Sequence, residues 1–307
     1  MKSELQTQTP AATADAVAVP VHDPAVHRRK VAQSRIRSVA KHVVLILASV
    51  VMIYPLLWML VSSFRPTDVI FRTPGLWLND LIITNYTEGW YALSYPFSQY
   101  IINSAIVVVG AVAGNLFACS LAAYAFARLR FRLKMMWFSI MLVTVMLPIH
   151  VVIVPQYILF SQAGWINTFL PLVVPQLLAC DAFFIFLMVQ FIRGIPRELD
   201  EAAAIDGAGH GRIFFSLILP LLRPALLTTG VLTFIWTFND FLRQLVYLSD
   251  KSRYTVPLGL NSFIDRASGS SYGGMLAMSV VTLVPTVAVF LISQRRLVEG
   301  VATTGIK

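Results

Sequence analysis

Six apolar stretches, each long enough to cross a lipid bilayer, dominate this sequence. A hydrocarbon core of about 30 Å takes about 20 helical residues to span. The stretches fall at roughly 42–63, 100–122, 135–158, 170–192, 222–246 and 275–294. They make the chain 57% hydrophobic and 13% charged, against about 45–50% and about 25% in soluble proteins. We therefore predict an all-α membrane protein with six transmembrane helices, and a soluble enzyme is nearly excluded.

The six stretches divide the chain into three parts. Residues 1–41 are expected to form a disordered, basic cytoplasmic tail, because their first 27 residues follow no helical or strand period. The apolar stretch that follows is too long for a signal peptide and lacks a cleavage site, so it should remain as the first span. Residues 42–294 form the six-span domain, and residues 295–307 form a second cytoplasmic tail.

Positive charge is distributed unevenly over the tails and loops. Of the 24 Lys and Arg residues, 18 lie in the tails and in the loops on the same side as the tails, and six lie in the loops of the other side. The side richer in Lys and Arg is the cytoplasmic one. Both termini are therefore expected in the cytoplasm, at the inner (cytoplasmic) membrane of the cell. The net charge of +9 is then explained by contact with membrane lipid and not with nucleic acid.

Asp181 lies inside the fourth stretch, where a charge opposes insertion. An Asp near the middle of a span costs about 2.5–3.5 kcal/mol, and each Leu, Ile, Phe or Val offsets about 0.3–0.6 kcal/mol. Thirteen such residues lie between Leu172 and Ile192, so the segment still inserts and Asp181 is expected not to face lipid. The two cysteines, Cys119 and Cys180, also lie in apolar stretches, which predicts buried free thiols and no metal site.

The cytoplasmic segment 195–220, between the fourth and fifth stretches, differs from the rest of the chain. Pro196 suits the first turn of a helix, and three acidic residues follow where the positive end of the helix dipole stabilises them. Three glycines within 207–211 end this helix and allow a sharp bend. An apolar run then begins a second helix, so the segment predicts two helices joined by a glycine turn and projecting from the membrane.

A family resemblance rests on this segment. Glu201-Ala202-Ala203, then Gly207, then Leu217-Ile218-Leu219-Pro220 resembles the E-A-A…G…I-x-L-P loop of permeases of binding-protein-dependent ABC importers. The string E-L-D-E-A-A-A-I-D-G-A that begins at Glu198 is similar to the carbohydrate-uptake branch. Leu217 stands where the family has Ile, a swap of similar volume. The six-span layout is similar to that of the smaller permease subunit of the maltose importer.

The resemblance implies that the segment contains a coupling helix, which docks in a cleft of an ATP-hydrolysing subunit and transmits its movement to the spans. The residues that it assigns to this coupling are Glu198, Glu201, Ala202, Ala203, Asp206 and Gly207. The end of the chain resembles a tail that reaches between the two ATPase subunits, which implies contacts from Thr304 and Gly305. An ordinary basic stop after the last span is the alternative reading of this tail.

Polar groups inside the spans are candidates for the substrate pathway, because they are costly in lipid. Trp236, Asn239 and Asp240 in the fifth stretch combine an aromatic face with the amide and carboxylate groups that bind sugar hydroxyls. Asp181 in the fourth stretch joins them. Hydrogen bonding between helices, including those of a partner permease, is the alternative.

The sequence lacks the phosphate-binding pattern G-x-x-x-x-G-K-[ST]. ATP and Mg are therefore expected on a partner ATPase, and this chain is expected to have no catalytic residue, metal or cofactor of its own. The implied partners are a second homologous permease, the ATPase dimer and an extracellular substrate-binding protein, secreted or lipid-anchored. The expected function is the permease subunit of an ATP-driven importer that translocates a disaccharide, an oligosaccharide or a sugar derivative.

Two other classes of protein remain as alternatives. An ion-coupled secondary transporter should have several buried ionisable groups or two similar halves. An intramembrane enzyme needs a cluster of His and carboxylate groups, or a nucleophile with a base. The sequence shows neither pattern, and neither class explains segment 195–220.

Overall fold

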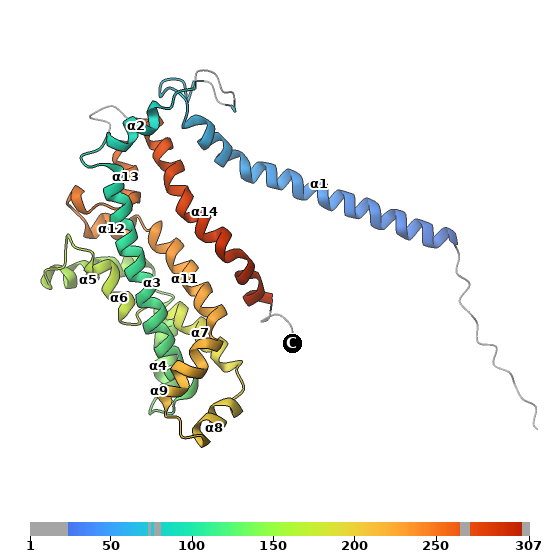
Figure 1. Cartoon of the computed structure of the whole chain (residues 1–307), viewed down its shortest axis with the longest axis vertical. Helices are drawn as coiled ribbons and strands as arrows, with labels where there is room; N and C mark the ends of the chain where they lie inside the picture. The colour runs from blue at the N-terminus through green and yellow to red at the C-terminus, as the bar shows by residue number, and fades with distance from the viewer. Residues whose placement is uncertain (1–23, 73–74, 77–80, 265–270, 303–307) are drawn as a thin grey trace, which may run out of the picture. The chain divides into compact units, whose positions relative to one another are not determined.

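The computed structural model describes residues 24–72, 75–76, 81–264 and 271–302. Within these ranges the chain forms helices and turns and no β-strand (Figure 1), so the expected all-helical class is confirmed. The chain divides into two compact units, residues 1–56 and 57–307, and each unit is described by itself.

Fourteen α-helices and two short helices of other types are described, in chain order: α1 (Pro24–Ser62), α2 (Thr84–Tyr91), α3 (Phe97–Arg128), α4 (Lys134–Thr144), α5 (Ile149–Gln162), α6 (Leu170–Leu177), α7 (Ala182–Arg193), α8 (Glu198–Ile205), α9 (His210–Ile213), the π-helical turn η1 (Phe214–Ile218), α10 (Leu219–Leu221), α11 (Arg223–Phe238), α12 (Leu242–Tyr247), the 3₁₀ turn η2 (Lys251–Arg253), α13 (Val256–Ser262) and α14 (Tyr272–Ala302).

Helix α1 supplies all the described residues of the first unit. It begins at Pro24, inside the stretch 1–41 that we expected to be disordered, so residues 24–41 are helical and that expectation is corrected. Pro fixes a helical φ at the first position of a helix, and no Gly or Pro interrupts residues 25–54. Residues 1–23 lie outside the described residues.

Four helical segments are each long and apolar enough to cross a membrane: Arg37–Ser62, Phe97–Arg128, Leu170–Arg193 and Tyr272–Gln294. Two bent helix pairs, Lys134–Thr144 with Ile149–Gln162 and His210–Leu221 with Arg223–Phe238, bring the number to six if each pair is one span. The described chain therefore has four to six candidate spans.

The third and fifth expected spans differ from continuous helices. Helices α4 and α5 meet at 104°, with Pro148 extended at the break (φ −61°, ψ 135°), because a proline removes a helical N–H and disfavours the helical conformation of the preceding residue. The expected fifth span, 222–246, ends early, since α11 stops at Phe238 and α12 begins only at Leu242.

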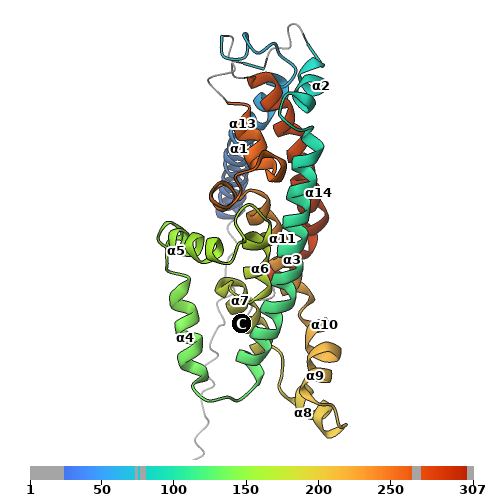
Figure 2. The same ribbon diagram turned by 90° about the vertical axis from the view of Figure 1, so that its left-hand side faces the viewer.

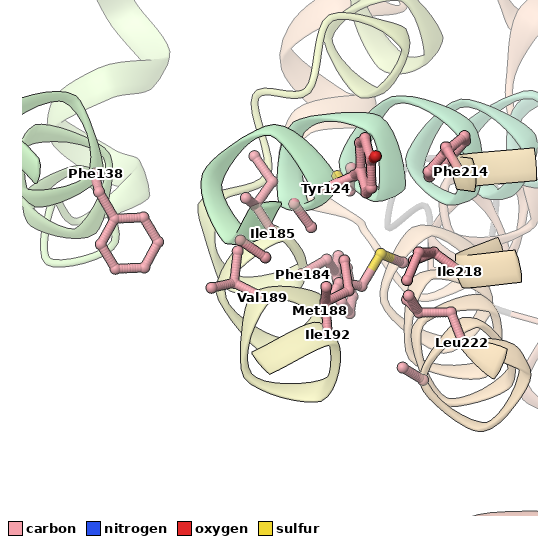
Figure 3. Close-up of a cluster of buried hydrophobic side chains, with 14 of the residues drawn as sticks. Tyr124, Phe138, Phe184, Ile185, Met188, Val189, Ile192, Phe214, Ile218 and Leu222 are labelled. Atoms are coloured by element: carbon pink, nitrogen blue, oxygen red, sulfur yellow. The ribbon is translucent and has the colours of Figure 1, made fainter. Parts of the chain in front are cut away.

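Buried side chains join α3, α7 and the helical segment α9–η1 into the largest apolar cluster of the second unit (Figure 3). Tyr124 of α3 lies against Phe214, with ring centroids 5.2 Å apart, and Met188 and Ile192 of α7 fill the space between these helices. Helices α8 and α9 lie at one end of this unit, and α2 and α13 lie at the other (Figure 2). The cluster thus fixes the base from which α8 projects.

Candidate functional site

Helix α8 is a short helix with an acidic first turn. Pro196 lies just before it, not within it, and Arg197 precedes its first residue, Glu198. Three acidic side chains occupy the first turn, where the exposed N–H groups and the positive end of the helix dipole stabilise negative charge. An eight-residue helix is too short to be stable alone, so its position depends on packing against its base.

The end of α8 has the hydrogen bonds of a Schellman motif. The N–H of Ala208 donates to the carbonyl of Ala203 at 2.9 Å, and the N–H of Gly207 donates to that of Ala204 at 3.0 Å. Gly207 has a φ of +81°, the left-handed conformation that this motif requires at the residue after the cap. A Cβ at Gly207 would meet no atom within 4 Å, so the requirement for glycine is conformational and not steric.

The residues expected to take part in coupling lie on two faces of α8. Glu198, Glu201, Ala202, Asp206 and Gly207 are exposed. Ala203 is half-buried and packs on the apolar cluster, so it lies on the inner face of α8, away from the other five residues.

Sequence reasoning missed Ile205, whose side chain is 87% exposed on the open face of α8. A large apolar side chain exposed among acidic neighbours marks a surface suited to contact with another protein. The helical spacing of Ala202 and Ile205 on one face could have identified it.

A second missed feature anchors the inner face of α8. Arg128, the last residue of α3, forms an ion pair with Asp200, with Nε 2.6 Å from Oδ2. Its Nη2 also donates to the carbonyl of Ile195 at 2.8 Å. The two partners are 72 positions apart in the sequence, so no local pattern pointed to this pair.

All four residues expected in the substrate pathway line one cavity. Its volume is about 680 Å³, and residues from α3, α4, α5, α6, α7, α11 and α12 and the turns beside them surround it. Asp181, Trp236, Asn239 and Asp240 are among them. The structure thus brings these residues together, although the two stretches that carry them are separated by segment 195–220.

Breaks in two helices bring the polar residues to the cavity. Asp181 is the residue before the start of α7 and follows Ala179, which has a φ of +54°, by two positions. Asn239 and Asp240 lie between the end of α11 and the start of α12. Non-helical backbone between apolar helices is tolerated where it is buried in protein or lines a cavity, and here both breaks lie at the same cavity.

Aromatic and charged side chains are arranged side by side in the cavity wall. The ring of Trp236 lies 5.4 Å from that of Phe183 and 5.2 Å from that of Phe184, yet the residue is 49% exposed. Asp240 Oδ1 accepts from the N–H of Arg243 at 3.1 Å, and Oδ2 lies 3.7 Å from the guanidinium. Arg243 lines the cavity and was missed in the sequence because it lies near the predicted end of a span.

Uncharged polar groups connect the helices around the cavity. Asn115 of α3 donates to the hydroxyl of Thr233 of α11 at 3.1 Å, and the hydroxyl of Tyr247 of α12 donates to Gln156 of α5 at 3.1 Å. All four residues also line the cavity. Hydrogen bonds between helices and contact with a cavity are therefore combined in the same side chains.

The remaining expectations concern cysteines, metal and the tail. Cys119 is a buried free thiol as expected, but Cys180 is exposed and lines the cavity, since it lies in the break before α7. Over the described ranges, no group of three or more His, Cys, Asp or Glu side chains could hold a metal ion. Thr304 and Gly305 lie outside the described residues.

Comparisons with known proteins agree with this architecture. Residues 114–302 match the family described as binding-protein-dependent transport system inner membrane component. The chain is 31% identical over 262 residues to the diacetylchitobiose uptake system permease protein NgcG of Streptomyces coelicolor, covering 85% of this chain and 86% of that protein. It is also 31% identical to the sn-glycerol-3-phosphate transport system permease protein UgpE of Yersinia enterocolitica, with 84% and 94% covered.

The fold is similar to that of a solved structure. A chain in the crystal structure of a bacterial ABC transporter involved in the import of the acidic polysaccharide alginate superimposes with a TM-score of 0.75. The match covers 86% of this chain and 97% of that chain at 21% identity.

Proposed function

The chain belongs to the family of binding-protein-dependent transport system inner membrane components and is a permease subunit of an ABC importer, and we propose that its cavity is part of the path of a sugar or sugar derivative into the cytoplasm. The observation that carries this proposal is the convergence of Asp181, Trp236, Asn239 and Asp240 on one cavity. The related permeases of diacetylchitobiose and sn-glycerol-3-phosphate transport systems support a carbohydrate or a polyol derivative as the substrate.

The chemistry of the cavity suits such a substrate. The half-exposed Trp236 offers an aromatic face on which the apolar side of a sugar ring can stack. Asn239 can donate to and accept from hydroxyls, whereas Asp181 and Asp240 accept from them. A volume of about 680 Å³ is within the range of about 300–1,000 Å³ that is typical of small-molecule sites, so a disaccharide can enter.

The other subunits of the importer supply the nucleotide chemistry and the second half of the pathway. An ABC importer has an ATPase and a substrate-binding protein as partners. We further propose that ATP and Mg bind only on a separate ATPase dimer, and that a second, homologous permease completes the pathway. In this arrangement six spans cross the inner membrane, each bent pair counting as one, and both termini lie in the cytoplasm, in keeping with the excess of Lys and Arg on that side.

The open face of α8 is proposed to couple ATP hydrolysis to transport. Glu198, Glu201, Ala202, Asp206 and Gly207 form this face together with Ile205. The acidic side chains can pair with basic groups of an ATPase cleft, and Ile205 can fill an apolar pocket there. Ala203 supports the helix from its inner side, and contact of Thr304 and Gly305 with the ATPases stays a prediction. Closure of the ATPase dimer would then move α8 and reorient the helices around the cavity.

The test is reconstitution of this chain in proteoliposomes with its second permease, ATPase pair and binding protein. A radiolabelled panel of diacetylchitobiose, maltose, arabinotriose and glycerol 3-phosphate would be offered to them. We expect uptake of at least one compound that requires both ATP and the binding protein. Uptake by this chain alone, driven by a proton or sodium gradient, would instead support the ion-coupled alternative, with Asp181 and Asp240 as the coupling groups.

A further inference from the structure

Arg128 is buried at the point where α3 meets the entry to α8. Its side chain is 6% exposed, and that of its ion-pair partner Asp200 is 18% exposed. The guanidinium also holds the carbonyl of Ile195, in the turn that leads into α8. One side chain of α3 thus holds both the backbone before α8 and its first turn.

The contact between Arg128 and Asp200 is ionic, and part of the hydrogen-bonding capacity of both side chains is unused. Neither Arg128 Nε nor Asp200 Oδ1 makes a hydrogen bond within the described part of the chain. A buried ion pair contributes little net stability, but removal of one partner leaves an uncompensated charge. The position of α8 is therefore sensitive to this pair, while the apolar cluster of α3, α7 and α9 stabilises the surrounding fold.

The acidic first turn of α8 is divided between two roles. Glu198 and Glu201 are exposed, whereas Asp200 is half-buried and faces α3. Adjacent positions of a helix point in different directions, so α8 can present two acids outward and keep a third for its own anchor.

Two routes connect α8 with the cavity. Along the chain, the route passes Gly207, the π-helical turn η1 and a bend of 74° before it reaches α11, and each of these can absorb a displacement. Through Arg128, the route enters α3, which continues as one helix of 32 residues. Asn115, which lines the cavity and binds Thr233 of α11, lies on the same helix about 20 Å from Arg128 at 1.5 Å per residue.

We propose that Arg128 is a positioning residue for coupling: by holding Asp200 and the carbonyl of Ile195, it makes α8 move as one body with α3. A displacement of α8 then reaches the cavity through α3 and Asn115. The inference rests on the proposed function of α8 and adds the internal route by which its movement is transmitted.

The experiment measures how much ATP is hydrolysed for each sugar molecule taken up by the complete importer in proteoliposomes. The variants are Arg128→Gln, Asp200→Asn and the double variant, with the panel compound that the unaltered importer takes up fastest. We expect the ATP hydrolysed per sugar to rise by about 2–30-fold in each single variant, the range for changes along a coupling network. In the double variant the ATP hydrolysed per sugar should be no higher than in either single variant, because the two changes remove the same interaction.

Arg132→Gln is the matched control, since it removes the same charge from an exposed position four residues further along the chain. It should leave the ratio of ATP to sugar unchanged. If uptake and ATP hydrolysis fall together in Arg128→Gln and Asp200→Asn, so that the ratio stays constant, the pair is merely structural and the inference is wrong. If the importer with Arg128→Gln does not assemble, the ratio of ATP to sugar measured for Asp200→Asn alone tests the inference. If the unaltered importer shows no ATP-dependent uptake, the proposed function fails instead.

Discussion

Replacement of Gly207 by Val tests whether the C-terminal turn of α8 is needed for transport. Gly207 has a φ of +81° and open space around its Cβ position, so the substitution acts through backbone conformation alone. A left-handed conformation costs an ordinary L-residue about 1–2 kcal/mol, and a β-branched residue there is a genuine outlier. The Schellman motif should therefore open, and the last turn of α8 should fray.

The structure supplies a matched control for this substitution. Gly209 also has no atom within 4 Å of its Cβ position, but its φ is −73° with a ψ of 166°, a conformation that valine adopts readily. Gly209→Val therefore adds the same side chain two residues away without the conformational cost.

ATP-dependent uptake in proteoliposomes is the assay, with the amount of inserted protein measured by immunoblot. A cost of 1–2 kcal/mol reduces the population of the intact turn by a factor of about 5–30, and we expect uptake by Gly207→Val to fall by about that factor. Gly209→Val should retain more uptake than Gly207→Val, because its backbone conformation suits valine and the N-cap position of α9 that it occupies has no side-chain hydrogen bond to lose. Equal activity of the two variants would refute the role assigned to the turn.

Three further predictions concern the open face of α8 and the cavity. Ile205→Asp should weaken co-purification of the ATPase in detergent, because it places a charge on the apolar contact surface; retention of the ATPase at the level of Ile205→Val would contradict this. Trp236→Ala should raise the KM for sugar uptake by about 2–10-fold, the effect expected from the loss of one aromatic contact. Trp236→Phe should retain most of the affinity, and identical KM values for the two variants would exclude stacking. Asp240→Asn should change the relative uptake of the panel compounds, because it leaves Arg243 without its anionic partner, and unchanged selectivity would return Asp240 to a structural role.

Much of the site could be read from the sequence because it depends on local chemistry. Gly207 was expected to end a helix, and its left-handed conformation is one that glycine adopts at little cost. The acidic residues from Glu198 onward were expected in a first turn, where the helix dipole stabilises them. The loop pattern around Glu201 identified an importer permease, which the family match confirms.

The bends of the helices were less accessible to sequence reasoning. A proline such as Pro148 at the break between α4 and α5 favours a kink, but proline alone does not give an angle. The 104° and 74° bends depend on how the segments on either side pack against their neighbours. The same limitation applies to the end of α11 at Phe238, since an apolar pattern continues past it.

By itself, the sequence determined that this chain is an all-helical membrane protein and which short segment projects from it, because hydropathy and turn chemistry act over about 20 neighbouring residues or fewer. Only the tertiary structure decided which side chains meet. Asp181 joins Trp236 and Asp240 at one cavity, Ala203 turns inward while Ile205 stays exposed, and Arg128 pairs with Asp200. These contacts join residues from different helices, and the packing of those helices, not their hydropathy, sets which faces approach one another.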